Sequence, residues 1–161
     1  MSSCVFPGSF DPLTNGHLNL ILRTAAMYDE VNVTVMVNRS KPGCIPYEER
    51  VRMIRKACAE IPNVRVEMWN GLLADYMRNH PGAVVVRGVR NVLEFEQEMN
   101  AAAINRRLFP GLETVLIPAT DEFEEVSSSA VREIASFGGD YSCFVPACNR
   151  NELKKWLKRK E

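Results

Sequence analysis

The sequence has no apolar run long enough to cross a membrane, and its first residues form neither the basic segment nor the apolar core of a leader peptide. We therefore expect a cytoplasmic protein with no membrane partner. No two cysteines form a CxxC pair, and their number, five, is odd. Neither a disulfide framework nor a zinc site is predicted from Cys4, Cys44, Cys58, Cys143 and Cys148.

Charge of one sign is not in excess, because 20 Lys and Arg residues balance 20 Asp and Glu residues. A balanced chain has no overall field that attracts nucleic acid or an acidic lipid surface, so we expect neither partner. The motifs GxGxxG, GxxxxGK[ST] and HExxH are missing as well. A phosphate-binding site in this chain must therefore be built from charges that the fold gathers locally.

Short β-branched runs alternate with amphipathic segments along the chain, and no repeat, low-complexity tract or linker interrupts them. We predict a single domain over residues 1–161. The expected strands are residues 3–6, 31–37, 64–68, 83–87 and 114–117, of which 83–87 is expected to be the most buried. Helices are expected over residues 47–60, 72–79, 92–108 and 151–160. Two more are expected, one beginning after residue 14 and one beginning at Ser127–Ser129.

This order predicts an α/β fold: a doubly wound, Rossmann-like parallel sheet of five strands in the order 3-2-1-4-5, with helices on both faces. Ligands of such sheets bind beyond the carboxyl ends of the strands, where the strand order reverses. The polar residues that follow strand ends are Ser9 and His17 after the first, Lys41 after the second, Arg87 and Arg90 after the fourth, and Ser127–Ser129 after the fifth. We therefore predict one site at this edge of the sheet.

The first turn, residues 7–17, has the sequence PGSFDPLTNGH and joins the first strand to the first helix. Such a turn aims backbone N–H groups and the positive end of a helix at one point, which favours phosphate binding. Thr14 or Asn15 is expected to be the N-cap. The imidazole of His17 would lie beside the phosphate and donate to oxygens that gain charge during attack at phosphorus. A general-base role is weaker, because a phosphate nucleophile needs no deprotonation.

Two arginines and a lysine supply the expected local positive charge. Arg87 and Arg90 flank Gly88 in a turn, so both guanidinium groups can fold over one anion. Lys41 offers a compact charge for a phosphoryl oxygen. The structural alternative is that Arg87 pairs with Glu94 or Glu98, which share one helix face. Together with the first turn and Lys41, the pattern favours phosphate binding. For Glu98, a structural role and an active-site role both stay open.

Ser127–Ser129 bring three hydroxyl groups to the start of a helix. One serine is enough for an N-cap, so three favour a cradle for the outer oxygens of a polyphosphate. His80 is expected to be structural. The run Ala101–Ala103 is interpreted as tight helix packing or as a subunit contact. In the last helix Leu153, Trp156 and Leu157 are expected to pack inward, with the lysines on a solvated face.

Seven motifs in this order carry a family resemblance: PGSFDP at 7–12, TNGH at 14–17, YEER at 47–50, RGVR at 87–90, FEQEM at 95–99, NR at 105–106 and VSSSAV at 126–131. Together they resemble the bacterial phosphopantetheine adenylyltransferases, the T-x-G-H branch of the nucleotidyltransferase superfamily. The resemblance implies an enzyme that transfers the adenylyl group of ATP to 4′-phosphopantetheine by direct in-line attack, giving dephospho-coenzyme A and pyrophosphate in coenzyme A biosynthesis. Two alternatives stay open: a nucleotidyltransferase for another phosphomonoester, and a non-catalytic ATP-binding module.

The resemblance also implies roles for individual residues. Phosphopantetheine would be bound by Ser9, Lys41, Leu73 and Arg87, and catalysis would depend on His17, Lys41 and Arg90. The implied ATP site comprises Ser9, Phe10, His17, Gly88, Val89, Arg90, Glu98, Phe123, Glu124, Glu125, Val126, Ser127, Ser128 and Ser129. Further implications are Mg²⁺ carried mainly by the phosphates of ATP, with no protein ligands, a homohexamer, and feedback inhibition by coenzyme A.

Overall fold

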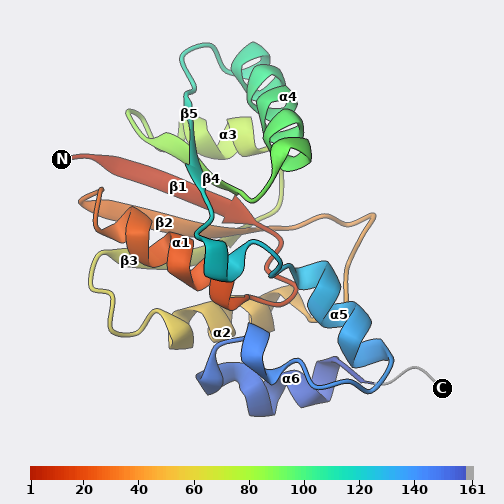
Figure 1. Cartoon of the computed structure of the whole chain (residues 1–161). Helices are drawn as coiled ribbons and strands as arrows, with labels where there is room; N and C mark the ends of the chain where they lie inside the picture. The colour runs from red at the N-terminus through yellow and green to blue at the C-terminus, as the bar shows by residue number, and fades with distance from the viewer. Residues whose placement is uncertain (159–161) are drawn as a thin grey trace.

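A computed structural model describes residues 1–158 of the chain. Within them, five parallel strands form one sheet in the order β3-β2-β1-β4-β5 (Figure 1), which confirms the predicted order. The strands are β1 (Ser3–Gly8), β2 (Glu30–Met36), β3 (Val64–Trp69), β4 (Val84–Val89) and β5 (Thr114–Pro118). The strand order reverses between β1 and β4, and the first turn therefore leaves the sheet at the reversal point.

Helices cover both faces of the sheet, as predicted (Figure 1). On one face lie α1 (Asn15–Ala25) and α2 (Tyr47–Ala57), and on the other lie α3 (Leu73–Arg78) and α4 (Val92–Leu108). The chain continues with α5 (Ser128–Ser136) and α6 (Arg150–Trp156), and short 3₁₀ turns cover Asp121–Phe123, Ser142–Phe144 and Ala147–Asn149. No helix in this part of the chain combines the length and the apolar composition needed to span a bilayer.

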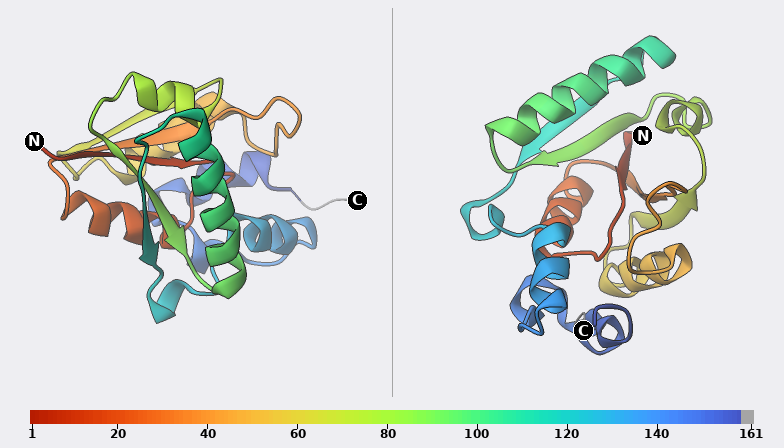
Figure 2. Two further views of the ribbon diagram at one scale, coloured as in Figure 1. Left: turned by 90° about the horizontal axis from the view of Figure 1, so that it is seen from above. Right: turned by 90° about the vertical axis from the view of Figure 1, so that its right-hand side faces the viewer.

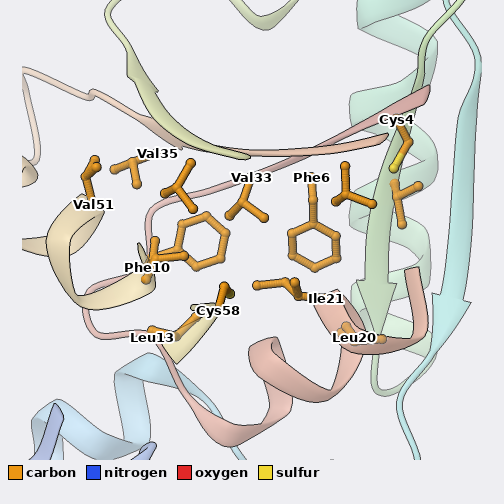
Figure 3. Packing of buried hydrophobic residues seen from close by; sticks show 14 of the residues in the cluster. Cys4, Phe6, Phe10, Leu13, Leu20, Ile21, Val33, Val35, Val51 and Cys58 are labelled. Atoms are coloured by element: carbon orange, nitrogen blue, oxygen red, sulfur yellow. The ribbon is translucent and has the colours of Figure 1, made fainter. Parts of the chain in front are cut away.

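The main core lies between the sheet and the α1–α2 layer (Figure 3). Side chains alternate along β1, so Cys4 and Phe6 enter this core while Val5 packs with Tyr76 and Met77 on the opposite face. Phe10 follows β1 into the main core, and its ring stacks on Phe6 with 6.2 Å between centroids. The first turn is therefore anchored to the core by an aromatic side chain of its own.

The most buried strand is β2 and not β4, which the sequence predicts to be the most buried. Five of the seven positions of β2 are buried, whereas in β4 only Val85 and Val86 are. The reason is the helix that covers β4 and β5. No side chain is buried anywhere along α4, which lies over these strands at the outside of the molecule (Figure 2, right). The continuous apolar run at residues 83–86 therefore led to a prediction of more burial for β4 than the structure shows.

A second core cluster joins α2, α5 and α6 and includes Met53, Val131 and Leu153. The predicted helix 151–160 extends over Arg150–Trp156, and residues 159 and 160 lie outside the described residues. Leu153 and Leu157 are buried as predicted, but Trp156 is 36% exposed. A residue directly before Leu157 is turned about 100° away from it on a helix, so it leaves the buried face.

Candidate active site

The first turn ends in a capping box that involves the predicted histidine. Thr14 is the N-cap of α1, and its hydroxyl oxygen accepts from the backbone N–H of His17 at 3.2 Å. In return, the backbone N–H of Thr14 donates to Nδ1 of His17 at 3.1 Å. An N–H group can only donate, so Nδ1 is an acceptor and a neutral ring carries its proton on Nε2.

The imidazole of His17 is partly buried and lies edge-on to the ring of Phe10, with 5.2 Å between centroids. Burial and the positive charges of Arg87 and Arg90 lower its pKa to about 4. The ring is therefore neutral near pH 7 and presents one N–H donor. At Gly8 a Cβ atom would lie 3.0 Å from the Phe10 ring, so glycine lets that ring fold back against the end of β1.

Arg87, near the end of β4, forms a two-pronged ion pair with Glu98 of α4. Its Nε donates to one carboxylate oxygen at 2.9 Å and its Nη2 to the other at 2.6 Å. Nη1 donates to the backbone carbonyl of Pro7. The ion pair expected as the structural alternative is thus present, and it ties β4 and α4 to the end of β1.

The sequence predicts a turn at residues 87–90, but β4 continues through Val89 and Arg90 is the residue directly after it. Arg90 forms the next ion pair. Its guanidinium and its backbone N–H both donate to the carboxylate of Glu94, the backbone bond being 2.9 Å long. Partial burial of Glu94 opposes ionisation, but these hydrogen bonds outweigh it and hold the pKa of the carboxyl below its usual value. Both arginines therefore face the cavity as members of ion pairs, with part of each guanidinium left to bind a ligand.

Two cavities meet beside Arg87. The first, about 320 Å³, is lined by predicted ATP-site residues: Phe10, His17, Gly88, Arg90, Glu98, Phe123, Val126, Ser127, Ser128 and Ser129. The second, about 270 Å³, is lined by Ser9 and Leu73 of the predicted phosphopantetheine site. Four residues line both: Pro7, Gly8, Arg87 and Glu98. The structure thus brings the two sets of predicted residues to adjacent hollows that share one ion pair.

The three serines at the start of α5 each have a hydrogen bond inside the protein. Ser127 is the N-cap and accepts from Ala130 N at 3.0 Å, Ser128 donates to the carbonyl of Pro12 at 2.7 Å, and Ser129 accepts from Arg132. Within residues 1–158, the backbone N–H groups of Ser128 and Ser129 have no hydrogen-bond acceptor. A helix start that lines the cavity with two such donors is suited to an anion.

Some predicted residues lie outside both cavities. Lys41 is exposed on the segment between β2 and α2, and Glu124 and Glu125 are exposed just before α5. Val89 ends β4 and does not line either hollow, while Ser9 lines the second cavity and not the first. Lys41, Glu124 and Glu125 lie on exposed segments that connect strands and helices, and the order of the strands alone does not fix where such side chains point.

Small residues of α4 line the second cavity, a role that the sequence did not suggest. Ala101, Ala102 and Asn105 face it one and two turns after Glu98. The available signal was their helical spacing of three, four and seven residues from Glu98, which puts them along one side of α4. His80, by contrast, has the predicted structural role, because its ring stacks on Tyr76 at 4.2 Å.

The residues of this site do not fit a resident metal ion. No group of three His, Cys, Asp or Glu side chains among the described residues is placed to hold one. Glu94 and Glu98, the two carboxylates of the first cavity, both face arginines. Their negative charge is thus already compensated within the protein.

Comparisons with known proteins connect this geometry to a family. The model of a family described as Cytidylyltransferase-like matches residues 5–134 of the chain. A protein named phosphopantetheine adenylyltransferase from Heliobacterium modesticaldum is 45% identical over 146 residues, which cover 91% of this chain and 87% of that protein. Another of the same name, from Streptomyces coelicolor, is 42% identical over 160 residues, which cover 99% of this chain and 100% of that protein.

A more distant solved structure shares the fold. The bifunctional NMN adenylyltransferase/ADP ribose pyrophosphatase from Francisella tularensis superposes with a TM-score of 0.71 at 17% identity, over 97% of this chain and 49% of that chain. At this identity the similarity bears on the fold alone. The family model and the two close relatives go further, and they show that the chain belongs to the cytidylyltransferase-like family and, within it, to the phosphopantetheine adenylyltransferases.

Proposed function

We propose that the protein transfers the adenylyl group of ATP to 4′-phosphopantetheine, releasing pyrophosphate and forming dephospho-coenzyme A, the penultimate step of coenzyme A biosynthesis. The observation that carries the proposal is the pair of cavities that meet at Arg87 and Glu98. One hollow presents a histidine N–H and a helix start, and the other is lined by small and apolar side chains. Two substrates bound there would have their reacting groups side by side.

ATP is assigned to the first cavity. Its outer phosphates would accept from the free N–H groups of Ser128 and Ser129, where the positive end of α5 also favours negative charge. Its α-phosphate would lie near Nε2 of His17 and the guanidinium of Arg90.

Phosphopantetheine is assigned to the second cavity, where Leu73 and Ala101 would contact its uncharged arm. The phosphate end would lie at Arg87. A guanidinium has five N–H groups, and three of those on Arg87 donate to Glu98 and Pro7, so two remain for phosphate oxygens. Lys41 and Ser9 would complete the phosphate site.

The chemistry follows from this placement. An oxygen of the acceptor phosphate attacks the α-phosphorus, a new P–O bond forms, and the bond from that phosphorus to the bridging oxygen breaks as pyrophosphate leaves. The nucleophile is already an anion, so no residue has to remove a proton. The neutral imidazole of His17 donates Nε2–H to an oxygen that gains charge, while Arg90 and Lys41 offset the charge on the phosphates.

Mg²⁺ is proposed to arrive with the phosphates of ATP, because oxygen ligands from phosphate and water satisfy its octahedral preference. The protein's own residues would bind the phosphate oxygens that the ion leaves free.

A homohexamer is proposed, and the exposed apolar surface of α4 supports a contact between subunits. Exposed apolar side chains follow this helix, namely Val92, Leu93, Phe95, Met99, Ile104 and Leu108. Patches of this kind mark protein contacts. We expect Ile104→Glu to lower the mass measured by light scattering, whereas Phe137→Glu, at an exposed apolar residue outside α4, leaves it unchanged. An unchanged mass for the Ile104 variant would contradict an interface at α4.

Feedback by coenzyme A is proposed to occur at the same two cavities. Coenzyme A contains both the adenosine part of one substrate and the pantetheine arm of the other, so one molecule can occupy both hollows. We expect it to compete with both substrates in initial-rate measurements. If coenzyme A inhibits without competing with ATP or with phosphopantetheine, its binding site lies outside these two cavities.

The direct test of the proposed function measures pyrophosphate release with ATP or CTP and a panel of phosphomonoesters, among them 4′-phosphopantetheine. Release is expected with ATP and phosphopantetheine together, and only background release with ATP alone. Faster release with another acceptor would assign the enzyme to that acceptor. Binding of ATP with no release from any pair would favour a non-catalytic nucleotide-binding module.

A further inference from the structure

The segment between β2 and α2, residues 37–46, is called the Lys41 loop below. It carries Lys41 at an exposed position and has no regular secondary structure. In the proposed function this lysine binds the acceptor phosphate beside Ser9. A long, flexible side chain on an exposed loop needs a fixed backbone to deliver its charge to one place. Contacts of the loop backbone therefore decide where the ammonium group can reach.

Arg50 of α2 makes the first of these contacts. Its side chain is 2% exposed, and its Nε donates to the carbonyl of Ile45 at 2.8 Å while Nη2 donates to the carbonyl of Pro42. Nη1 donates to the carbonyl of Ser9 at 3.0 Å. One buried guanidinium thus joins the Lys41 loop to Ser9, a residue of the first turn that lines the second cavity.

Asp11 reinforces this junction from the first turn. Its carboxylate accepts from the backbone N–H groups of Cys44 at 3.0 Å and Ile45 at 2.9 Å, and it lies 3.5 Å from Nη2 of Arg50. Gly43 has a φ of +77°, and a Cβ atom there would collide with the Asp11 carboxylate and the Arg50 guanidinium. Glycine is therefore needed for the loop to approach this buried ion pair.

Tyr47, one helical turn before Arg50, holds the other half of the loop. Its hydroxyl accepts from the N–H of Asn38 at 3.0 Å, donates to the carbonyl of the same residue at 2.9 Å, and lies 3.4 Å from the carbonyl of Lys41. Its ring lies under the Arg50 guanidinium at 4.2 Å, a cation–π contact. Two side chains of one helix turn thus fix the loop on both sides of Lys41.

We propose that Arg50 and Tyr47 are positioning residues that hold the Lys41 loop against Ser9, so that the Lys41 ammonium reaches the acceptor phosphate at Arg87. The inference deepens the proposed function and rests on it. Burying an arginine destabilises the folded protein unless its N–H groups have acceptors. Here the acceptors are backbone carbonyls of the Lys41 loop and of Ser9. An error of about 1 Å in such placement costs on the order of a hundredfold in rate.

The test is a double-mutant cycle on the full-length protein, with pyrophosphate release as the assay. Arg50→Lys is expected to lower kcat/KM for phosphopantetheine by about tenfold or more, with the Kd for ATP within about twofold of wild type. In a Lys41→Met background the same change is expected to cost less than about twofold, because the charge that it positions is gone. Arg55→Lys is the matched control, since Arg55 also lies on α2 and donates to a backbone carbonyl, that of Val66.

Tyr47→Phe keeps the ring over Arg50 and removes only the hydroxyl, so it tests the inference even if Arg50→Lys unfolds the protein. We expect a smaller loss, about threefold, that also disappears in the Lys41→Met background. Thermal unfolding of each variant separates lost folding from lost positioning. An equal loss for Arg50→Lys or Tyr47→Phe with and without Lys41 would overturn the inference.

The same experiment separates the inference from the proposed function. Wild-type protein that releases no pyrophosphate with ATP and phosphopantetheine would overturn both. A Lys41→Met variant as active as wild type would overturn the positioning of Lys41 and leave the adenylyl transfer standing. An impaired Lys41→Met variant alongside a fully active Arg50→Lys variant would overturn the inference alone.

Discussion

The backbone N–H of Thr14 donates to Nδ1 of His17 across 3.1 Å, and this bond assigns the ring proton to Nε2. Thr14, the residue that caps α1, therefore also sets the tautomer of the His17 ring. We propose this ring as the donor to the transition state. A pKa of about 4 keeps the ring neutral at physiological pH, so the donor does not depend on a proton from solvent.

Replacing His17 is expected to affect turnover more than ATP binding. His17→Ala should lower kcat by about 10²-fold or more, because one donor to the developing charge is lost. The Kd for ATP should change little, since the arginines and the start of α5 remain. Steady-state kinetics and ATP titration check this, with His80→Gln as the control for the other histidine. Near-normal turnover of His17→Ala would refute the role.

The lowered pKa of His17 predicts a pH dependence of stability. In the unfolded chain this histidine takes up a proton below about pH 6.5, whereas in the folded protein it does so only near pH 4. The unfolded state binds more protons between these values, so the free energy of unfolding falls as the pH is lowered from 6.5 towards 4. The slope from this group is at most about 1.4 kcal/mol per pH unit.

Urea denaturation of wild type and His17→Gln at several pH values measures the contribution of His17 to the pH dependence of the free energy of unfolding. The variant is expected to lose less stability than wild type on acidification, and His80→Gln is again the control. Parallel curves for wild type and His17→Gln would show that His17 titrates alike in the folded and unfolded chain.

Thr14 should matter both for the helix and for the histidine. Thr14→Val removes the capping oxygen and is expected to cost about 0.5–2 kcal/mol of stability. We also expect a fall in kcat, because the Thr14 hydroxyl, 3.1 Å from Nδ1 of His17, supports the ring together with the backbone N–H. Thr14→Ser restores the oxygen and should recover both. Thr24→Val removes another buried hydroxyl of α1, bonded to the carbonyl of Leu20, and should lower stability only. A kcat unchanged in Thr14→Val would separate the cap from the chemistry.

Arg87 should discriminate between the two substrates. Arg87→Ala is expected to weaken phosphopantetheine more than ATP, because we assign its two remaining N–H groups to the acceptor phosphate, whereas Arg90, which lines only the first cavity, is retained. Isothermal titration calorimetry with each ligand checks this. Arg106→Ala removes an exposed arginine that pairs with Glu113 at 2.7 Å and is expected to leave both affinities unchanged. A larger loss for ATP than for phosphopantetheine would reverse the assignment of the cavities.

Local sequence patterns predicted the sheet order. They also predicted the edge of the sheet where the two cavities of the candidate site lie, because the strand order brings the residues after β1, β4 and β5 together. They favoured phosphate over a carboxylate as the partner of Arg87, and they left the role of Glu98 open. In the structure Glu98 accepts from Nε and Nη2 of Arg87, and Arg87 also lines both cavities. The ion pair therefore does not exclude the phosphate contact that we propose.

Contacts between distant segments could not be predicted. The hydrogen bond from Arg50 to Ser9 joins residues 41 positions apart, and neither residue type nor spacing announces it. The lack of buried side chains on α4 was equally hidden, since its apolar residues resemble those of a packed helix. Which surface an apolar side chain meets depends on tertiary, and in the proposed hexamer on quaternary, structure.

The central claim is a single direct transfer between two substrates in adjoining cavities, and the stereochemistry at phosphorus tests it most directly. ATP with one oxygen of the α-phosphate replaced by sulfur, in one known configuration, is converted with phosphopantetheine, and the configuration of the thio-substituted product is determined. One in-line displacement inverts the configuration at the α-phosphorus, and inversion is the predicted result. Retention would mean two displacements through an adenylylated enzyme and would contradict the account.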